Sequence, residues 1–404
     1  MNLPTLRWLL LPFGVVKLSS LRRCLSCIFL LCVISLTACS IPQVRAEDRL
    51  LLNLSLDFLD EYDLPKLTFD GSPVGGLSGI TYDRQLDRFY AISDDRSERA
   101  PARFYTLKLT VGEADGTPKL ETVEIEKVTT LKDEDGQPFA EGTVDLEGIG
   151  LSPRRSLFIS SEGASREGIA PFIAEFDLET GQLRGKLPIP NRFLPAVVED
   201  QPVGVQDNQG FEALTINASG SAGGQLEPFR LFTATESALE QDLPDPAGKA
   251  GSPQPIPIRL QHYLIGENQT TLLSEHLYLA EPPSAGATGG LSELLTLDQG
   301  GHFLSLERSF GLTTGLSAQL FQIATGGATD ISGAVSLKGD LTGIMPVFKR
   351  SLLNLAELGI PLDNLEGMTL GARLPDGTQS LLLISDDNFS DVQKTQLLLF
   401  RLQS

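Results

Sequence analysis

The stretch Leu146-Glu147-Gly148-Ile149, followed after a turn by Leu157-Phe158-Ile159-Ser160-Ser161-Glu162, is one copy of a unit that recurs along the chain. Each copy opens a strand with an apolar residue, a Ser or Glu, a usually small residue and an apolar residue. A second apolar strand then ends in an acidic residue. The other opening tetrads are Leu77-Ser78-Gly79-Ile80, Phe211-Glu212-Ala213-Leu214, Leu291-Ser292-Glu293-Leu294 and Leu365-Glu366-Gly367-Met368. Self-similarity of this kind indicates a repeat architecture.

Each interval between tetrads holds a third strand, such as 104–109 in the first copy, and the first three intervals offer a fourth. Four antiparallel strands per unit, repeated radially, predict an all-β fold, a β-propeller of five blades. A sixth blade is allowed if a degenerate unit lies within 310–364. Only three strands follow the last tetrad, so we expect residues 50–57 to supply the missing outer strand and close the ring.

Three segments interrupt the repeat. Residues 217–228 and 240–257 are rich in Gly, Ser and Pro and are interpreted as surface loops. Residues 345–362 contain the best helical pattern of the chain, with Gly359 and Pro361 as stop signals. No second domain is indicated, and residues 50–404 are expected to form one propeller domain.

The N-terminus has the pattern of an export signal. Residues 1–46 carry five basic residues and no acidic one, and Arg22-Arg23 stand directly before the apolar run 24–36. The run ends at Leu36-Thr37-Ala38-Cys39, which resembles a bacterial lipobox. We therefore expect residues 1–39 to be a signal peptide, Cys39 to be lipidated and residues 40–49 to be a linker. A retained membrane anchor, which would need about 20 apolar residues, and cleavage after Val44-Arg45-Ala46 to give a soluble secreted protein are the alternatives.

The positions of the cysteines and the net charge argue against several classes of function. All four cysteines lie at or before Cys39, so the predicted mature domain has no disulfide, thiol nucleophile or Cys metal site. The formal net charge of −20 disfavours nucleic acid and anionic lipid as partners, which leaves the lipid anchor as the expected membrane contact. The sequence predicts a periplasmic or cell-surface protein.

The repeat places carboxylates at equivalent points. One set follows the first residue of the tetrad, where two copies have Ser instead of Glu, and a second set follows the next strand. In a propeller both would ring one end of the central channel, and converging carboxylates bind a hard cation or hold raised pKa values. The expected Ca²⁺ ligands are Asp94, Glu147, Glu162, Glu212, Glu236, Glu366 and Asp386; Asp95, Glu307 and Asp387 belong to the same acidic strand ends. The alternative is structural, with the glutamates accepting backbone N–H groups and fixing the turns.

Arginines adjoin several of these acids, and guanidinium groups bind phosphate or carboxylate in a bidentate manner. The expected substrate-binding residues are Arg96, Arg103, Arg166 and Arg308. Ordinary surface ion pairing is the alternative. The chain has no G-x-S-x-G elbow, P-loop or H-E-x-x-H motif. A serine hydrolase is weakly supported, because His302 beside Glu307 would be its only plausible base.

The blocks around Leu77, Leu146 and Phe211, together with the closing block Asn364-Leu365-Glu366-Gly367-Met368 and Ile384-Ser385-Asp386-Asp387-Asn388, resemble the phytase-like esterase domain family of exported bacterial proteins. The resemblance spans roughly residues 70–402. It implies a propeller and hydrolysis of phosphate or other esters, with no catalytic residue set to carry over. Glu293 departs from the pattern, since Gly or Ala is expected there.

Two functions of different class follow. The first is a Ca²⁺-dependent hydrolase of phosphate or other ester substrates, with the carboxylates as metal ligands. The second is a non-catalytic propeller that binds a ligand or protein partner at the cell surface. Arginines at the acidic mouth would favour the first, and an aromatic-lined mouth the second.

Overall fold

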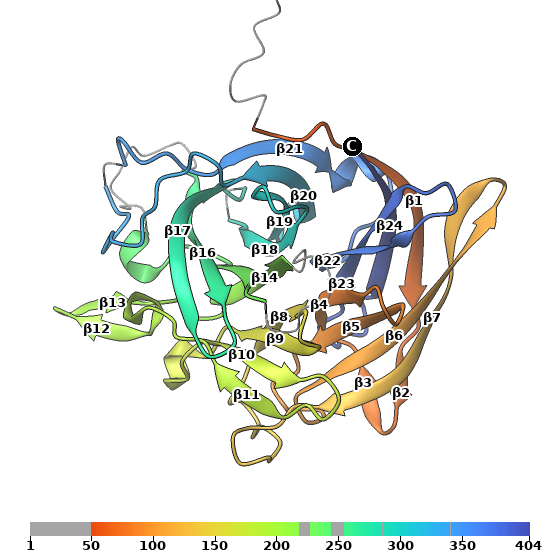
Figure 1. Ribbon diagram of the computed structural model, residues 1–404, viewed down its shortest axis with the longest axis horizontal. Coiled ribbons are helices and arrows are strands. Elements are labelled where there is room, and N and C mark those ends of the chain that lie inside the picture. Colours follow the sequence, from red (N-terminus) through yellow and green to blue (C-terminus); the bar gives the residue numbers. More distant parts are fainter. Residues whose placement is uncertain (1–49, 218–226, 244–253, 285, 340) are drawn as a thin grey trace, which may run out of the picture. The chain divides into compact units, whose positions relative to one another are not determined.

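The computed structural model describes residues 50–217, 227–243, 254–284, 286–339 and 341–404, and within them five four-stranded antiparallel sheets are arranged around a central axis (Figure 1). Blade 1 contains β4 (Leu77–Asp83), β5 (Arg88–Ser93), β6 (Arg103–Ala114) and β7 (Thr117–Thr130). Blade 2 contains β8 (Leu146–Leu151), β9 (Ser156–Ser161), β10 (Phe172–Asp177) and β11 (Leu183–Lys186). Blade 3 contains β14 (Phe211–Asn217), β15 (Phe229–Thr235), β16 (Ile256–Ile265) and β17 (Thr270–Ala280).

Blade 4 contains β18 (Thr288–Thr296), β19 (His302–Gly311), β20 (Gly315–Ala324) and β21 (Phe348–Asn354). Blade 5 contains β22 (Asn364–Arg373), β23 (Gln379–Asp386), β24 (Thr395–Gln403) and β1 (Ser55–Leu64). Two hairpins lie outside the blades, β2 (Leu67–Phe69) with β3 (Ser72–Val74) and β12 (Ala196–Val198) with β13 (Gln201–Val203). The predicted five-bladed propeller is confirmed, and no sixth blade occurs among the described residues.

The ring closes through the N-terminal strand. β1 pairs antiparallel with β24, from Ser55 opposite Gln403 to Leu64 opposite Thr395. The predicted partner is therefore right, but the strand begins five residues later than expected and continues to Leu64. The apolar run 50–54 suggested an earlier start, whereas pairing follows the alternating stretch that comes after it.

Five apolar cores lie between neighbouring blades. The period of two along each strand divides its side chains between two cores. On β5, Phe89 and Ala91 pack against blade 5, while Tyr90 and Ile92 pack against blade 2. Each blade is thus buried on both faces only because it has two neighbours, which explains why the unit is repeated around a ring.

The helix predicted within 345–362 is wrong. Phe348–Asn354 forms the outer strand β21, which pairs with β20, and only Leu355–Leu358 make a short 3₁₀ turn (η5) before Gly359. The edge of β20 supplies backbone hydrogen-bond partners that local sequence preference does not reveal. This segment completes blade 4 instead of beginning a sixth blade.

The two predicted loops lie partly outside the described residues. What is described there fits a connection between blade strands: β15 begins at Phe229, a 3₁₀ turn (η4) covers Glu240–Asp242, and β16 begins at Ile256. The predicted signal peptide, Cys39 and the linker 40–49 all lie outside the described residues. Among those that are described, none belongs to a helix long and apolar enough to cross a bilayer.

Candidate functional site

The inner strands β4, β8, β14, β18 and β22 meet around the axis, and each contains a β-bulge near the start of its tetrad. The register skips one or two residues directly after the leading apolar residue of every tetrad. The bulge residues are Ser78, Glu147, Glu212, Ser292 and Glu366. Because bulges re-aim side chains, Glu147, Glu212 and Glu366 converge at one end of the channel, where their carboxylate oxygens lie within 4.8 Å of one another.

The second set of acids arrives at the same end through a repeated backbone contact. The N–H groups of Asp94, Glu162 and Glu236 donate to the carbonyl oxygens of Gly76, Asp145 and Gly210, at 2.8, 2.9 and 2.8 Å. These acceptors all lie just before the start of an inner strand. Asp386 ends β23 at the equivalent place, opposite Asn364.

Blade 4 breaks this pattern. The leading residues of the other tetrads pair with Ser93, Ser161, Thr235 and Ser385, and Leu291 pairs with Glu307. The residue equivalent to Asp94 or Glu162 is therefore Arg308, not Glu307. Since neighbouring strand residues point to opposite faces, Glu307 leaves the ring and accepts from Tyr278 Oη and from Lys349 Nζ, at 2.7 Å.

Arg308 lies among the carboxylates as a built-in cation. Its Nη2 is 2.9 Å from Glu366, 3.4 Å from Glu236 and 3.5 Å from Glu212, and Nη1 donates to Asn364 Oδ1 at 3.2 Å. Arg308 therefore already compensates part of the negative charge that the sequence assigned to a bound cation or to retained protons.

A further carboxylate completes the site. Asp145 is buried, forms an ion pair with Arg96, and groups with Glu147 and Glu162 within 4.8 Å. Asp145 was not predicted from the sequence, although it stands directly before a tetrad, as Asn364 does. We call the end of the channel formed by these groups the acidic mouth: Asp94, Asp145, Glu147, Glu162, Glu212, Glu236, Glu366, Asp386, Arg96 and Arg308.

Burial and mutual repulsion raise the pKa of several of these acids. Burial raises the pKa of Glu366 to about 8; Arg308 opposes this shift, while Glu212 and Glu236 add to it. Burial, followed by repulsion from neighbouring carboxylates, raises the pKa well above its ordinary value at the other sites: Asp94, Glu147, Glu162, Glu212 and Asp386. Such a site favours either retained protons or a bound cation.

The four predicted substrate-binding arginines have different surroundings. Arg96 and Arg308 belong to the acidic mouth, and Arg96 also donates to Asn208 Oδ1 at 2.7 Å. Arg166 is mostly exposed and lies 3.2 Å from Asp207. Arg103 is buried and donates to Asp95 at 2.7 Å, to Tyr105 Oη at 2.6 Å and to backbone carbonyls. It serves the packing of blade 1, and we exclude it from the site.

The two aspartates of each Asp-Asp pair have different surroundings. Asp94 and Asp386 face the acidic mouth, while Asp95 accepts the N–H groups of residues 98–100 and Asp387 accepts those of Gly76 and Phe389. The second aspartate of each pair therefore fixes a turn, a role that the sequence suggested for the glutamates and not for these pairs. Asp386 also accepts the N–H group of Asn388, at 2.7 Å. His302 bonds to Asp298 at 2.7 Å and not to Glu307, which removes the basis for a serine hydrolase.

Glu293 has a role that the repeat could not reveal. The equivalent residues are small because inner strands crowd the axis: a Cβ on Gly148 would lie 2.5 Å from the carbonyl oxygen of Glu212. Glu293 instead accepts the N–H groups of Leu294 at 2.9 Å, of Leu214 at 3.1 Å and of Met368. It thereby connects the inner strands of blades 3, 4 and 5, and burial raises its pKa well above the ordinary value.

Comparison with known proteins gives one family. Residues 72–389 match the family model described as "Phytase-like: Esterase-like activity of phytase". A search of curated proteins finds no match.

Solved structures with remote similarity include the Penicillium chrysogenum α-L-arabinanase complexed with arabinobiose, at 9% identity and a TM-score of 0.37, covering 86% of this chain and 85% of that one. The Kuenenia stuttgartiensis hydrazine synthase matches at 10% identity and a TM-score of 0.30, covering 80% of this chain and 79% of that one. The N-terminal domain of Saccharomyces cerevisiae Nup159 matches at 10% identity and a TM-score of 0.29, covering 87% of this chain and 96% of that one. Similarity at these levels says nothing about activity.

Proposed function

Because the chain belongs to the phytase-like family, named for the esterase-like activity of phytase, we propose that it hydrolyses phosphate or other esters at the acidic mouth, with Ca²⁺ as cofactor. The observation that carries the proposal is the position of Glu147. It belongs to both three-carboxylate groups, one with Asp145 and Glu162 and one with Glu212 and Glu366. A change at Glu147 therefore affects every close-packed carboxylate group that the described residues form.

The donor set fits Ca²⁺. All the groups are carboxylates, and Ca²⁺ takes six to eight oxygen ligands in flexible geometry. Glu162 Oε1 is buried without a hydrogen-bond partner among the described residues, so at least one oxygen is available. The residues that would hold the ion are Asp145, Glu147, Glu162, Glu212 and Glu366, with Asp94, Glu236 and Asp386 around them. When bound, Ca²⁺ supplies positive charge for the anionic oxygens of an ester.

The protein's own groups supply substrate binding and release protons as the cation binds. Arg96 keeps about a third of its side chain exposed beside Asp145 and can bind an anionic ester group through its remaining N–H donors. Without a cation, burial holds the pKa of Glu366 at about 8, so this carboxyl group would release a proton near neutral pH when Ca²⁺ binds to it. The two arginines at the mouth favour hydrolysis over the alternative, non-catalytic binding.

We expect the purified protein to hydrolyse at least one member of a panel of phosphomonoesters, inositol hexakisphosphate and carboxylic esters. The rate should fall in EDTA and return with Ca²⁺. Glu147→Gln should lower kcat/KM by about a hundredfold or more, because it removes one charge from each carboxylate group. Glu113→Gln, an exposed change on the hairpin between β6 and β7, is the matched control. If no ester is hydrolysed and Ca²⁺ is without effect, the binding function replaces this proposal.

We also propose that the protein is exported and anchored through Cys39, on the strength of Leu36-Thr37-Ala38-Cys39. Metabolic labelling with a fatty-acid analogue should mark the wild-type protein and leave Cys39→Ala unmarked. Equal labelling of the two, or a mature N-terminus at Glu47, would contradict the lipid anchor and favour the soluble secreted form.

A further inference from the structure

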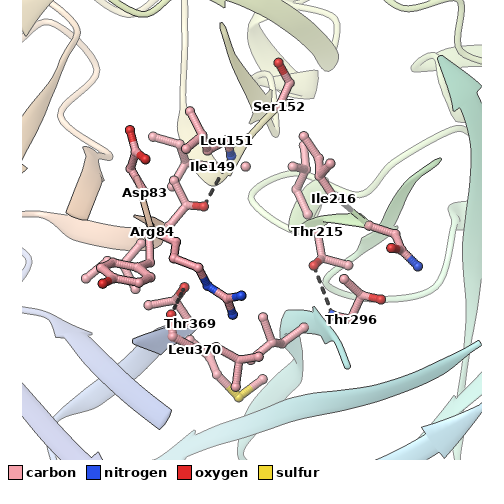
Figure 2. Close-up of a pocket in the computed structure, with 18 of the residues that line it drawn as sticks. Asp83, Arg84, Ile149, Leu151, Ser152, Thr215, Ile216, Thr296, Thr369 and Leu370 are labelled. Carbon is pink, nitrogen blue, oxygen red and sulfur yellow. Dashed lines mark hydrogen bonds between the residues drawn. The ribbon is translucent and has the colours of Figure 1, made fainter. Parts of the chain in front are cut away.

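The opposite end of the channel holds a cavity of about 590 Å³, lined by the C-terminal parts of the five inner strands and the turns that follow them. We call this cavity the cup; Figure 2 shows it. A volume of this size lies in the range of small-molecule sites, which are about 300–1,000 Å³. The acidic mouth contributes no residue to its lining.

The cup has an apolar interior. The last residue of each tetrad reaches its floor, and all five are buried: Ile80, Ile149, Leu214, Leu294 and Met368. Above them Leu151, Leu297 and Leu370 are only half-buried, although each also packs against an inter-blade core. Apolar side chains left partly open within a concave surface are typical of sites for ligands with an apolar body.

The two carboxylates that line the cup, Asp83 and Asp298, already have hydrogen-bond partners. Arg155 lies 2.9 Å from Asp83, and Asp298 is bonded to His302 at 2.7 Å. Arg84 is exposed, and its guanidinium group forms no hydrogen bond or ion pair with any residue of the described ranges. Figure 2 shows this side chain reaching into the middle of the cup. Among the described residues that line the cup, Arg84 is therefore the cation that no carboxylate pairs with.

We infer that the cup is a second binding site, separate from the acidic mouth, for an amphipathic anion: a carboxylate or phosphate head on an apolar body. The head pairs with Arg84, whose planar group matches either anion, and the body covers the half-buried leucines. Without Ca²⁺ the carboxylates of the acidic mouth would repel such a ligand, so the two ends of one channel differ in both charge and polarity.

Isothermal titration calorimetry tests this with four probes: octanoate, octyl phosphate, 1-octanol and acetate. Octanoate or octyl phosphate should bind more tightly than 1-octanol, which lacks the charge, and than acetate, which lacks the apolar body. Comparing the two anions identifies the preferred head. Arg84→Gln should weaken anion binding about tenfold, as expected for loss of a charged hydrogen bond, and leave 1-octanol unchanged.

Two matched variants locate the effect. Gln85→Glu adds a negative charge at the rim without changing side-chain shape and should also weaken anion binding. Arg373→Gln removes an exposed charge outside the cup and should change nothing. Glu147→Gln and EDTA should leave octanoate binding intact, which separates this site from the proposed hydrolytic one. No binding of either anion at about 1 mM, or equal binding by Arg84→Gln, overturns the inference.

Discussion

Deleting residues 50–64 should leave a chain that does not fold stably. β1 contributes to two cores at once: Leu56 and Phe58 pack against the core between blades 4 and 5, and Leu59, Tyr62 and Leu64 against the core between blades 5 and 1. Full burial of a large apolar side chain contributes roughly 1.5–3 kcal/mol, so these residues, of which Leu64 is buried and the others are partly buried, together contribute about 5 kcal/mol or more. That is comparable to the entire stability of a typical domain. Urea denaturation followed by circular dichroism measures the loss.

The deletion also leaves the edge of β24 unpaired, which invites association with other chains. A synthetic peptide of residues 50–64 should therefore restore folding when added in trans, whereas a peptide with Leu56, Phe58 and Tyr62 changed to Ser should not. A deletion variant that denatures at the same urea concentration as the full chain would show that the ring does not depend on this strand.

In EDTA, the free energy of unfolding should fall by a few kcal/mol as the pH rises from about 4.5 to about 8. Glu366 has its pKa raised to about 8 in the folded protein, so between these values the folded state keeps a proton that the unfolded state has lost. Stability falls with pH wherever the folded state binds more protons, and each pKa unit corresponds to about 1.4 kcal/mol. The raised pKa values of Glu147, Glu162 and Glu212 act in the same direction. Asp177, whose pKa Arg184 lowers, acts only below this range.

Ca²⁺ should reverse most of this loss at pH 8 and have little effect at pH 5, because protons and the cation compete for the same oxygens. A ligand at a hundredfold excess over its Kd stabilises the folded state by about 2.7 kcal/mol. Glu366→Gln should flatten the pH profile of the melting temperature and reduce the Ca²⁺ effect, while Glu113→Gln should change neither. A wild-type profile that rises between pH 5 and 8 in EDTA would rule out protonated acids at the mouth.

The repeat predicted the architecture because each blade of a propeller repeats the same pattern of strands, so the tetrads recur along the sequence at intervals of one blade. Tetrads such as the one at Leu146 mark where each inner strand begins, and the short count of strands after Leu365 called for a partner from the other end of the chain. The limits of β1 and the strand β21 could not be predicted in this way. Both are edge strands, whose extent depends on the partner they pair with more than on their own composition.

The sequence predicted that acidic residues gather at the site, but it did not predict that an arginine among them offsets part of their charge. Glu307 was assigned to the ring because it follows an apolar strand, and an error of one residue moves a side chain to the other face of a sheet. The observed strand pairing places Arg308 in the ring. There it forms ion pairs with carboxylates that the sequence assigned to Ca²⁺. Asp145 was missed because its position precedes the repeated tetrad. Asp145 and Asn364 occupy the same position in their blades, and this shared polar position becomes visible only once the blades are superposed.

Five copies of one unit would give the channel a rotational pseudo-symmetry, and a ligand on the axis would then have five nearly equivalent orientations. Blade 4 removes this degeneracy. It carries Arg308 where the other blades have a carboxylate, and Glu293 where the others have a small residue. The sector of the acidic mouth that blade 4 contributes therefore differs in charge and size from the other four. A ligand bound on the axis would have one preferred orientation instead of five.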